Sequence, residues 1–391
     1  MRRLVAIAFS LSLLWCWPVG RMAETRNRTA DSSVPMNLAP PTAAPPTAKP
    51  PTAKPPTAGA RVPRIYWTGG PETMDAVKKA GLVELAVPVA ELDVWKRSGF
   101  KATGIDPTEL KGRRPLAIPK LAGRGNVASA TRRPWIDANG WLFTHHPNGH
   151  FIHNELPAGK AELAAAEAYA YGTDTLISLT VTDRSNPAAL AAGVEDLKGA
   201  TKMLELLRHL PMRARSPIAD FSIVDNKSPL IDEVLNLLTR RNLLYRIVPT
   251  PVKDYAINIR LGSTEYPDSD AADPSAFAQL IRRRIGDENR SLRIYGSEVI
   301  IGHLTGDRDR ARLHLLNYSG REAHGLRIRL RGNYRIGKLH SFGLDRGAMA
   351  DSSKLSKLSK LEDEMVEGGV YEFTIPDVGY YTIVDLGTDS P

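Results

Sequence analysis

The spacing of hydrophobic and polar residues changes twice along the chain, and each change marks a new part of the predicted fold. In residues 62–212, short apolar runs alternate with segments whose apolar residues recur at helical spacing. The expected strands are 64–68, 82–88, 100–105 and 174–181, and the expected helices are 71–80, 92–98 and 159–171. Strands that alternate with helices favour an α/β domain with a parallel sheet.

Residues 213–297 repeat this alternation in a more compact form. The expected strands are 218–224, 244–248, 256–261 and 292–295, and the expected helices are 230–242 and 275–284. This order is typical of a doubly wound, flavodoxin-like α/β domain.

Three helices are expected to start in the same way, with a polar capping residue followed by proline at the first helical position. The three pairs are Asn186-Pro187, Ser228-Pro229 and Asp273-Pro274. The first pair introduces a long helix that we expect to reach about His209.

From residue 298 to 391 the helical spacing disappears. Short alternating segments separated by turn residues follow, at 299–304, 311–317, 325–331, 336–342, 371–375 and 380–386. Alternation with a period of two predicts strands with one buried face, as in an antiparallel β-sandwich.

The first 61 residues have a different composition from the rest. Met1-Arg2-Arg3 and the apolar run 4–17 resemble a secretory signal peptide or a signal anchor, which we assign to residues 1–20. The run is shorter than the roughly 20 apolar residues of a membrane span. Residues 21–61, with PPTA repeats at 40–58, predict a disordered, extended spacer. The protein is therefore expected to be exported, to the periplasm, the cell surface or the medium, with no membrane span beyond a possible N-terminal anchor.

Charge and cysteine content narrow the function classes. The chain has a net charge of +9, spread in short, separate groups. No zinc-finger spacing or aromatic RNA-binding motif accompanies the charge, so nucleic acid is not expected as a partner. Cys16, the single cysteine, lies in the leader, so the exported part would contain no disulfide. No glycine-rich phosphate loop is present, and we expect no cofactor. The sequence leaves an oligomer possible.

The order of the three parts resembles the trimeric-type β-galactosidases and related secreted glycoside hydrolases. In the C-terminal part, RLHLLNYSG (312–320) and YEFTIPDVGYYTIVDL (371–386) look like the last β-domain of such enzymes. RPWIDANGW (133–141) looks like a barrel strand that ends in polar site residues. The resemblance implies an α/β multidomain fold with a TIM-barrel-like domain, a flavodoxin-like domain and a C-terminal antiparallel β-sandwich. Residues 62–210 number only 149, whereas a complete barrel takes about 250 and rarely under about 200. The barrel must be shortened, or it must share strands with the next domain.

The same resemblance points to Asn154-Glu155 as the candidate catalytic pair. In the barrel clan of these enzymes, an Asn-Glu pair ends the fourth strand, where the Asn binds the sugar 2-hydroxyl and the Glu is the general acid/base. The apolar pair Phe151-Ile152 precedes it here, as expected for a strand that carries both residues to its carboxyl end. The alternative is an exposed loop carboxylate next to Pro157.

A retaining hydrolase also needs a second carboxylate about 5 Å away as the nucleophile. The local candidates are Asp137, Asp174 and Asp183. Glu167, within an alanine-rich helix, is expected to be a solvated or capping carboxylate.

Candidate substrate-binding residues are Trp135, Asn139, Trp141 and Asn154. An indole face stacks on the C–H face of a sugar, and Asn139 beside Trp141 suggests the end of a strand. The structural alternative is that the tryptophans, including Trp67 and Trp95, fill a small core.

Four histidines, at 145, 146, 150 and 153, surround the turn sequence Pro147-Asn148-Gly149 and predict a hairpin. A metal-dependent hydrolase is the remaining alternative, although no helix-borne metal motif is present and no metal site is assigned. The shortened barrel favours a non-catalytic relative that binds a glycan or another cell-envelope component; an active hydrolase that uses Glu155 is the second hypothesis.

Overall fold

In the computed structural model, the residues described are 62–118, 120–122, 135–179, 186–210, 216–297, 299–307, 309–342 and 361–388. The expected leader (1–20) and spacer (21–61) lie outside these ranges. None of the described helices is long and apolar enough to cross a membrane.

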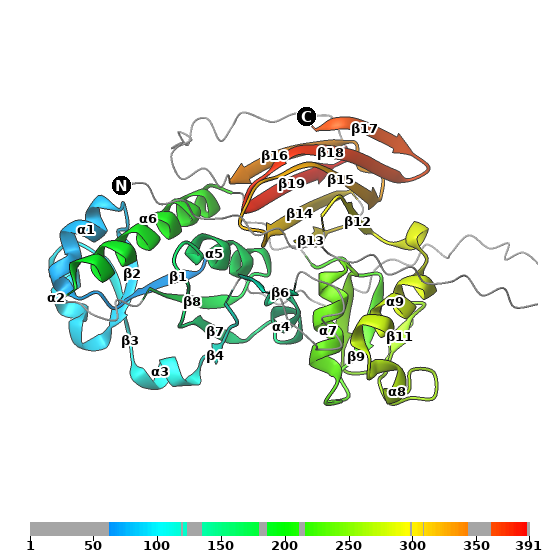
Figure 1. The fold of residues 1–391 in the computed structure, drawn as a ribbon, viewed down its shortest axis with the longest axis horizontal. Coiled ribbons are helices and arrows are strands. Elements are labelled where there is room, and N and C mark those ends of the chain that lie inside the picture. Colours follow the sequence, from blue (N-terminus) through cyan, green and yellow to red (C-terminus); the bar gives the residue numbers. More distant parts are fainter. Residues whose placement is uncertain are drawn as a thin grey trace, which may run out of the picture. The chain divides into compact units, whose positions relative to one another are not determined.

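The first part is built on a six-stranded sheet in which every pairing is parallel. Its strands are β1 (Arg64–Trp67), β2 (Glu84–Pro88), β3 (Lys101–Ile105), β4 (Arg114–Pro115), β7 (His150–His153) and β8 (Asp174–Leu179). The spatial order is β3-β2-β1-β8-β7-β4 (Figure 1). Neighbouring strands follow the chain order β1-β2-β3 and β4-β7-β8, and β8 pairs with β1, as it would in a closed ring. The ring is open between β3 and β4, which are the two edge strands. A β/α barrel has the same cyclic order with eight strands, so the shortened, barrel-like domain is confirmed.

Helices follow these strands as the alternation predicts. They are α1 (Met74–Lys79), α2 (Leu92–Arg97), α5 (Ala161–Ala170) and α6 (Pro187–His209), together with the short α3 (Pro107–Gly112), which was not predicted. The Asn186 side chain accepts hydrogen bonds from the backbone N–H groups of Ala188 and Ala189, which confirms the predicted start of α6.

Helix α5 is buried on nearly every side, because its small alanines let neighbouring elements approach closely. It packs against β8, α6 and β14 (Arg310–Asn317). One hydrophobic cluster joins residues from the parallel sheet, such as Trp67, to residues of the C-terminal part, such as Leu316 and Tyr381. The first and last parts of the chain therefore share a core.

The second part contains a three-stranded parallel sheet of order β10-β9-β11. Its elements are β9 (Phe221–Val224), α7 (Ile231–Arg240), β10 (Tyr245–Val248), β11 (Asn258–Ile259), α8 (Asp268–Ala271) and α9 (Pro274–Ile285). The order is that of a small flavodoxin-like sheet. Asp273 caps α9 as predicted. The predicted start at Ser228 is wrong by two residues, since Leu230 takes the N-cap position and α7 begins at Ile231.

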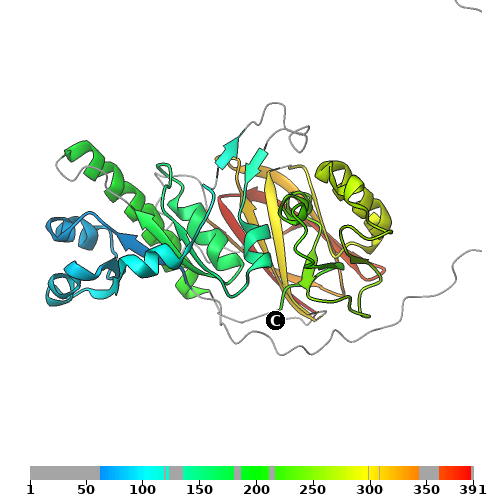
Figure 2. The same cartoon turned by 90° about the horizontal axis from the view of Figure 1, so that it is seen from below.

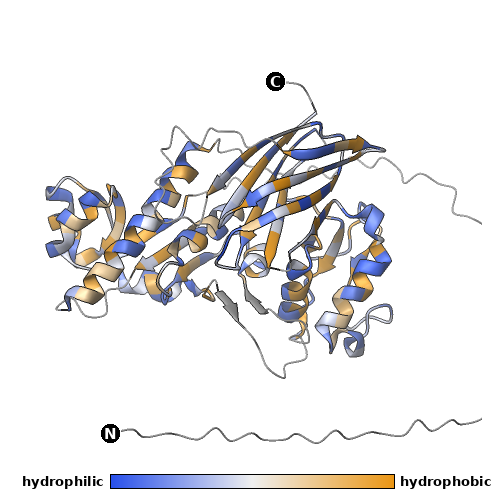
Figure 3. Ribbon diagram, turned by 45° about the horizontal axis from the view of Figure 1, so that its top comes forward, coloured by the Kyte–Doolittle hydropathy of each residue, from blue (hydrophilic) through white to orange (hydrophobic). Residues whose placement is uncertain are grey.

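The third part consists of two four-stranded antiparallel sheets, β12-β15-β18-β17 and β13-β14-β19-β16, which confirms the predicted β-sandwich. The strands not yet named are β12 (Leu292–Tyr295), β13 (Ile300–Gly306), β15 (Ala323–Arg331), β16 (Ile336–Phe342), β17 (Glu362–Glu367), β18 (Val370–Val378) and β19 (Tyr381–Gly387). Hydrophobic and hydrophilic residues alternate along these strands (Figure 3). The sequence pattern missed β17, all of whose residues are exposed.

Two predicted strands belong to other sheets than expected. Segment 292–295 is not part of the doubly wound sheet; it is the edge strand β12 and pairs antiparallel with β15. The segment 135–137 is not a barrel strand either. It forms β6 (Trp135–Asp137), which pairs antiparallel with β5 (Lys120–Ala122) outside the parallel sheet (Figure 2). The alternation of a short segment predicts that it is a strand, but it does not predict which strand it pairs with. That pairing depends on residues distant in sequence.

Candidate functional site

Strand β7 carries Asn154 and Glu155 to the carboxyl edge of the parallel sheet. It runs parallel to β4 and β8, and both residues follow its last residue, His153. Both side chains are exposed. The predicted position at the end of a barrel strand is therefore correct, and Glu155 is open to a ligand at the edge where barrel sites lie.

Asp174 lies at the opposite edge of the same sheet. It begins β8 and pairs with His150, the first residue of β7. The three steps from His150 to His153 cover about 10 Å, and Glu155 follows two residues later. The structure does not bring Asp174 to Glu155, so Asp174 is wrongly placed to be its catalytic partner.

Asp174 instead forms an ion cluster at the amino edge. Its carboxylate lies 2.6 Å from His150 Nδ1, 3.3 Å from Arg64 Nη2 and 3.4 Å from Arg113 Nη2. Burial acts to raise the pKa of Asp174, but the His150 hydrogen bond and the two arginine charges outweigh it and lower the pKa. The group remains ionised and stabilises the strand starts.

The other predicted carboxylate partners are only partly described. The backbone of Asp137 pairs with Lys120 in the β5–β6 pair, and its side chain, like that of Trp135, lies outside the described part of the structure. Asp183 also lies outside the described residues.

Glu167 is not a solvated carboxylate, as the sequence suggested, but a completely buried one. Its Oε1 accepts hydrogen bonds from the backbone N–H of Asn139 (2.6 Å) and from the hydroxyl of Tyr318 (2.5 Å). Its Oε2 accepts a third from Asn139 Nδ2 (2.8 Å). Burial raises the pKa of Glu167, and the three donors oppose this shift. Since Tyr318 follows β14, the carboxylate links the barrel-like part to the sandwich.

The Asn139 side chain also forms its hydrogen bonds within the protein, so it is not available to bind a substrate. Its Oδ1 accepts from the backbone N–H of Ala117, and its Nδ2 donates to the carbonyl of Ala117 as well as to Glu167. The side chain is buried, with 2% of its surface exposed. It anchors the start of α4 (Gly140–His145).

The described tryptophans pack in cores. Trp67 and Trp95 are fully buried, and Trp67 Nε1 donates to Thr73 Oγ1 at 2.8 Å. Trp141 on α4 is half-buried between the core of the flavodoxin-like part and a small cluster around Phe143. The structural alternative therefore holds for these three, and Trp141 is not placed as a sugar platform.

The four histidines do not converge, and the predicted hairpin is wrong. His145 ends helix α4, whereas His150 and His153 belong to the parallel strand β7. His145 lies 3.3 Å from both Asp225 and Asp232 of the flavodoxin-like part. In the described ranges, no group of three or more His, Cys, Asp or Glu residues could hold a metal ion. The histidine-dependent metal hydrolase has no support.

His153 is buried beside Glu167, with its Nε2 3.9 Å from Glu167 Oε2. Neither ring nitrogen has a hydrogen-bond partner among the described residues. Burial lowers the pKa of His153 to about 3. This neutral histidine belongs to the core.

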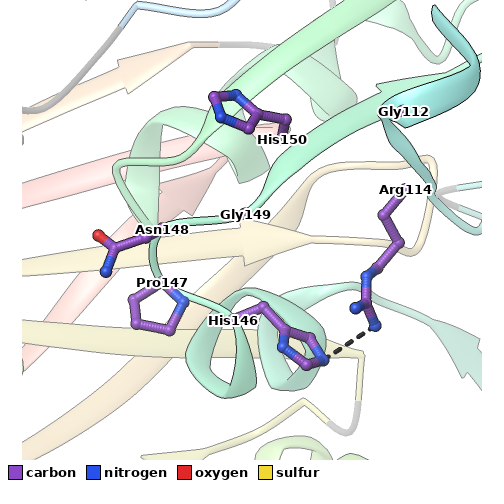
Figure 4. Close-up of a pocket in the computed structure, with 7 residues that line it drawn as sticks. All are labelled: Gly112, Arg114, His146, Pro147, Asn148, Gly149 and His150. Atoms are coloured by element: carbon purple, nitrogen blue, oxygen red, sulfur yellow. Dashed lines mark hydrogen bonds between the residues drawn. The ribbon is translucent and has the colours of Figure 1, made fainter. Parts of the chain in front are cut away.

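A shallow pocket of about 370 Å³ opens at the amino edge of the sheet. Arg114, His146, Asn148 and His150 line it with polar groups (Figure 4). Arg114 Nη1 donates to His146 Nε2 at 2.9 Å. Burial and the charge of Arg114 lower the pKa of His146, which keeps its ring neutral. We name this the amino-edge pocket. Its volume lies in the range of small-ligand sites.

Comparisons with known proteins reveal distant similarity only. No protein-family model matches the chain, and no curated protein matches it. Among solved structures it is similar to α-L-fucosidase isoenzyme 2 from Paenibacillus thiaminolyticus, at 10% identity and a TM-score of 0.46, over 73% of this chain and 66% of that one. It is also similar to a catalytic mutant of a GH42 β-galactosidase from G. stearothermophilus, at 7% identity and a TM-score of 0.38, over 70% and 59%. A third similar structure is a β-galactosidase from Rahnella sp. R3, at 8% identity and a TM-score of 0.35, over 77% of this chain and 63% of that one. The chain thus spans less than two thirds of the length of each enzyme, and at these scores only its own contacts carry the functional argument.

Proposed function

We propose that this protein is an exported, non-catalytic binding protein of glycoside-hydrolase-like architecture, and that its ligand is a glycan of the cell envelope. The order of a shortened barrel, a flavodoxin-like sheet and a β-sandwich supports the architecture. The charged and apolar first 20 residues, followed by the PPTA spacer, support export.

The location of Asp174, the one predicted partner whose side chain is described, supports the absence of catalysis. Hydrolysis of a glycosidic bond needs two carboxyl groups about 5–5.5 Å apart for retention, or about 6.5–9.5 Å apart for inversion. Asp174 is bound to His150 at the amino edge, whereas Glu155 follows the carboxyl end of the same strand. This separation is the single observation on which the proposal depends most.

The amino-edge pocket supports a binding role. Arg114, Asn148 and His150 offer donors and acceptors around a shallow volume, as a polar ligand with many hydroxyl groups requires. Asn154 offers a similar amide at the carboxyl edge, where it is exposed. The two asparagines allow the two edges to be compared with the same substitution.

A glycan array followed by calorimetry of the full chain tests the proposal. We expect Asn148→Ala to weaken binding of a bound glycan by about tenfold, the effect of losing one or two hydrogen bonds. The matched control, Asn154→Ala, should leave the affinity unchanged. Equal affinities for wild type and both variants would rule out the amino-edge pocket, and no binding to any glycan would rule out the proposal.

The alternative of an active hydrolase makes the opposite prediction about turnover. Wild-type protein would cleave a chromogenic glycoside, and Glu155→Gln would abolish the cleavage, because an amide cannot act as general acid. We expect no turnover from either protein.

A further inference from the structure

A second pocket lies where the flavodoxin-like part meets the edge of the sandwich. It has a volume of about 450 Å³, and its lining includes Arg241, Arg282, Arg290, Arg293 and Tyr295. Arg241 follows α7, Arg282 belongs to the last turn of α9, and Arg293 and Tyr295 belong to β12. We name this the arginine pocket. Neither the catalytic question nor the amino-edge pocket involves these residues.

Contacts within the protein hold three of these arginines in place. Arg282 binds both oxygens of Asp287, at 2.8 and 2.6 Å, and Arg290 binds the same carboxylate at 3.1 Å. The Arg282 hydrogen bonds hold the pKa of Asp287 well below its usual range. Arg241 donates to Ser275 Oγ at 2.7 Å. Guanidinium groups fixed in this way lose little entropy when they bind a ligand.

Positive charge is in excess in the arginine pocket. Among the interactions described, two carboxylates oppose the four guanidinium groups, namely Asp287 and the buried Asp220, whose charge interacts with that of Arg290. The buried Nε atoms of Arg290 and Arg293 have no hydrogen-bond acceptor among the described residues. Buried N–H groups without acceptors are uncommon, so the described contacts within the protein leave these two guanidinium groups partly unsatisfied.

The sheet surface beside the pocket is also rich in arginine. Arg293 and Tyr295 pair with Arg329 and Arg327 on β15, so the four side chains share one face of the sheet. Glu372 on β18 contacts both β15 arginines. Tyr295 is 41% exposed, so the edge of the pocket presents an accessible aromatic ring.

We propose that the arginine pocket binds an oxyanion carried on a saccharide, either a carboxylate or a phosphate ester. The planar guanidinium fork matches carboxylate and phosphate oxygens, and an exposed tyrosine ring can pack on the C–H face of the attached sugar. The saccharide part of this proposal rests on the proposed function. The anion part does not.

Calorimetry of the full chain tests the inference with four probes: trigalacturonate, glucose 6-phosphate, inorganic phosphate and the neutral galactotriose. We expect trigalacturonate or glucose 6-phosphate to bind wild type, and which of them binds identifies the anion. Arg293→Gln should weaken that binding by about tenfold. The matched control is Arg310→Gln, which removes one exposed arginine from the other sheet and should leave the affinity unchanged.

Tyr295→Ala is a second variant that changes an exposed side chain and is not expected to disturb folding. It should weaken binding of the saccharide anion and leave inorganic phosphate unaffected. Equal losses in Arg293→Gln and Arg310→Gln, or no binding of either saccharide anion, would overturn the inference. Loss of binding of the array-identified glycan in Asn148→Ala concerns the proposed function alone, so the two failures are distinguishable.

Discussion

Replacing Glu167 by glutamine removes one oxygen from a completely buried carboxylate. Oε1 can be kept, so the hydrogen bonds from the Asn139 N–H and the Tyr318 hydroxyl remain. The new amide N–H₂ would then face Asn139 Nδ2, which now donates to Oε2 at 2.8 Å. Asn139 cannot flip to accept, because its Oδ1 already accepts from Ala117 and its Nδ2 also donates to Ala117.

The expected cost follows from these contacts. A hydrogen bond to a charged group contributes about 1.5–3 kcal/mol, and a buried donor left without an acceptor costs about 1–3 kcal/mol. Removal of a buried charge offsets part of this loss. We therefore expect Glu167→Gln to lower the free energy of unfolding by about 2 kcal/mol.

Urea denaturation at pH 7 measures this change. Glu205→Gln on α6 is the matched control, because Glu205 is exposed and should change the unfolding midpoint little. Tyr318→Phe removes a single donor to the same carboxylate and should cost about 1.5–3 kcal/mol. If Glu167→Gln unfolds at the same midpoint as wild type and the control, the carboxylate does not join Asn139 and Tyr318 as described.

Two buried titratable groups predict opposite dependences of stability on pH. Burial lowers the pKa of His153 from about 6.5 to about 3. The ionisation of the ring therefore costs no stability above pH 6.5, but stability is lost as pH falls towards 3, because the unfolded chain then binds the proton more readily. At pH 4.5 this should lower the free energy of unfolding by roughly 3 kcal/mol. Between pH 7 and 4.5, His153→Leu should lose less stability than wild type in urea titrations, and an equal loss would contradict the burial of His153. Burial raises the pKa of Asp220 to about 6. The folded protein therefore holds the Asp220 proton more tightly than the unfolded chain, so the stability present below pH 3.8 is lost as pH rises through 6. Asp220→Asn, which keeps the acceptor for the Ser291 N–H, should therefore gain up to roughly 3 kcal/mol relative to wild type between pH 4 and 7; parallel stability curves would refute this.

Local signals in the sequence predicted the elements that depend on nearby residues. Asn186-Pro187 fixed the start of α6, because a capping side chain and a proline act on the adjacent turn. Strand periodicity likewise predicted β1, β2 and β3. Segment 292–295 was assigned to the wrong sheet because its partner, β15, lies more than 30 residues away.

The candidate site was harder to predict than the fold, since its contacts are all long-range. Glu167 and Tyr318 are 151 residues apart, and no local sequence pattern predicts that they are in contact. One signal was present in α5, whose alanines surround Glu167 on every side of the helix. A helix without a polar face is buried, so a charged residue within it needs buried partners. Similarly, the register that separates Asp174 from Glu155 depends on β8 pairing with β7.

The central claim, that the barrel-like domain does not hydrolyse glycosides, is tested most directly by turnover. Wild type, Glu155→Gln and Asn154→Ala are incubated with a panel of chromogenic glycosides, and the release of the chromophore is measured against a blank. We predict no release above the blank for any of the three proteins, because Asp174 lies at the edge opposite Glu155. Release by wild type that is abolished in Glu155→Gln would contradict the claim, and would mean that another carboxylate completes the pair.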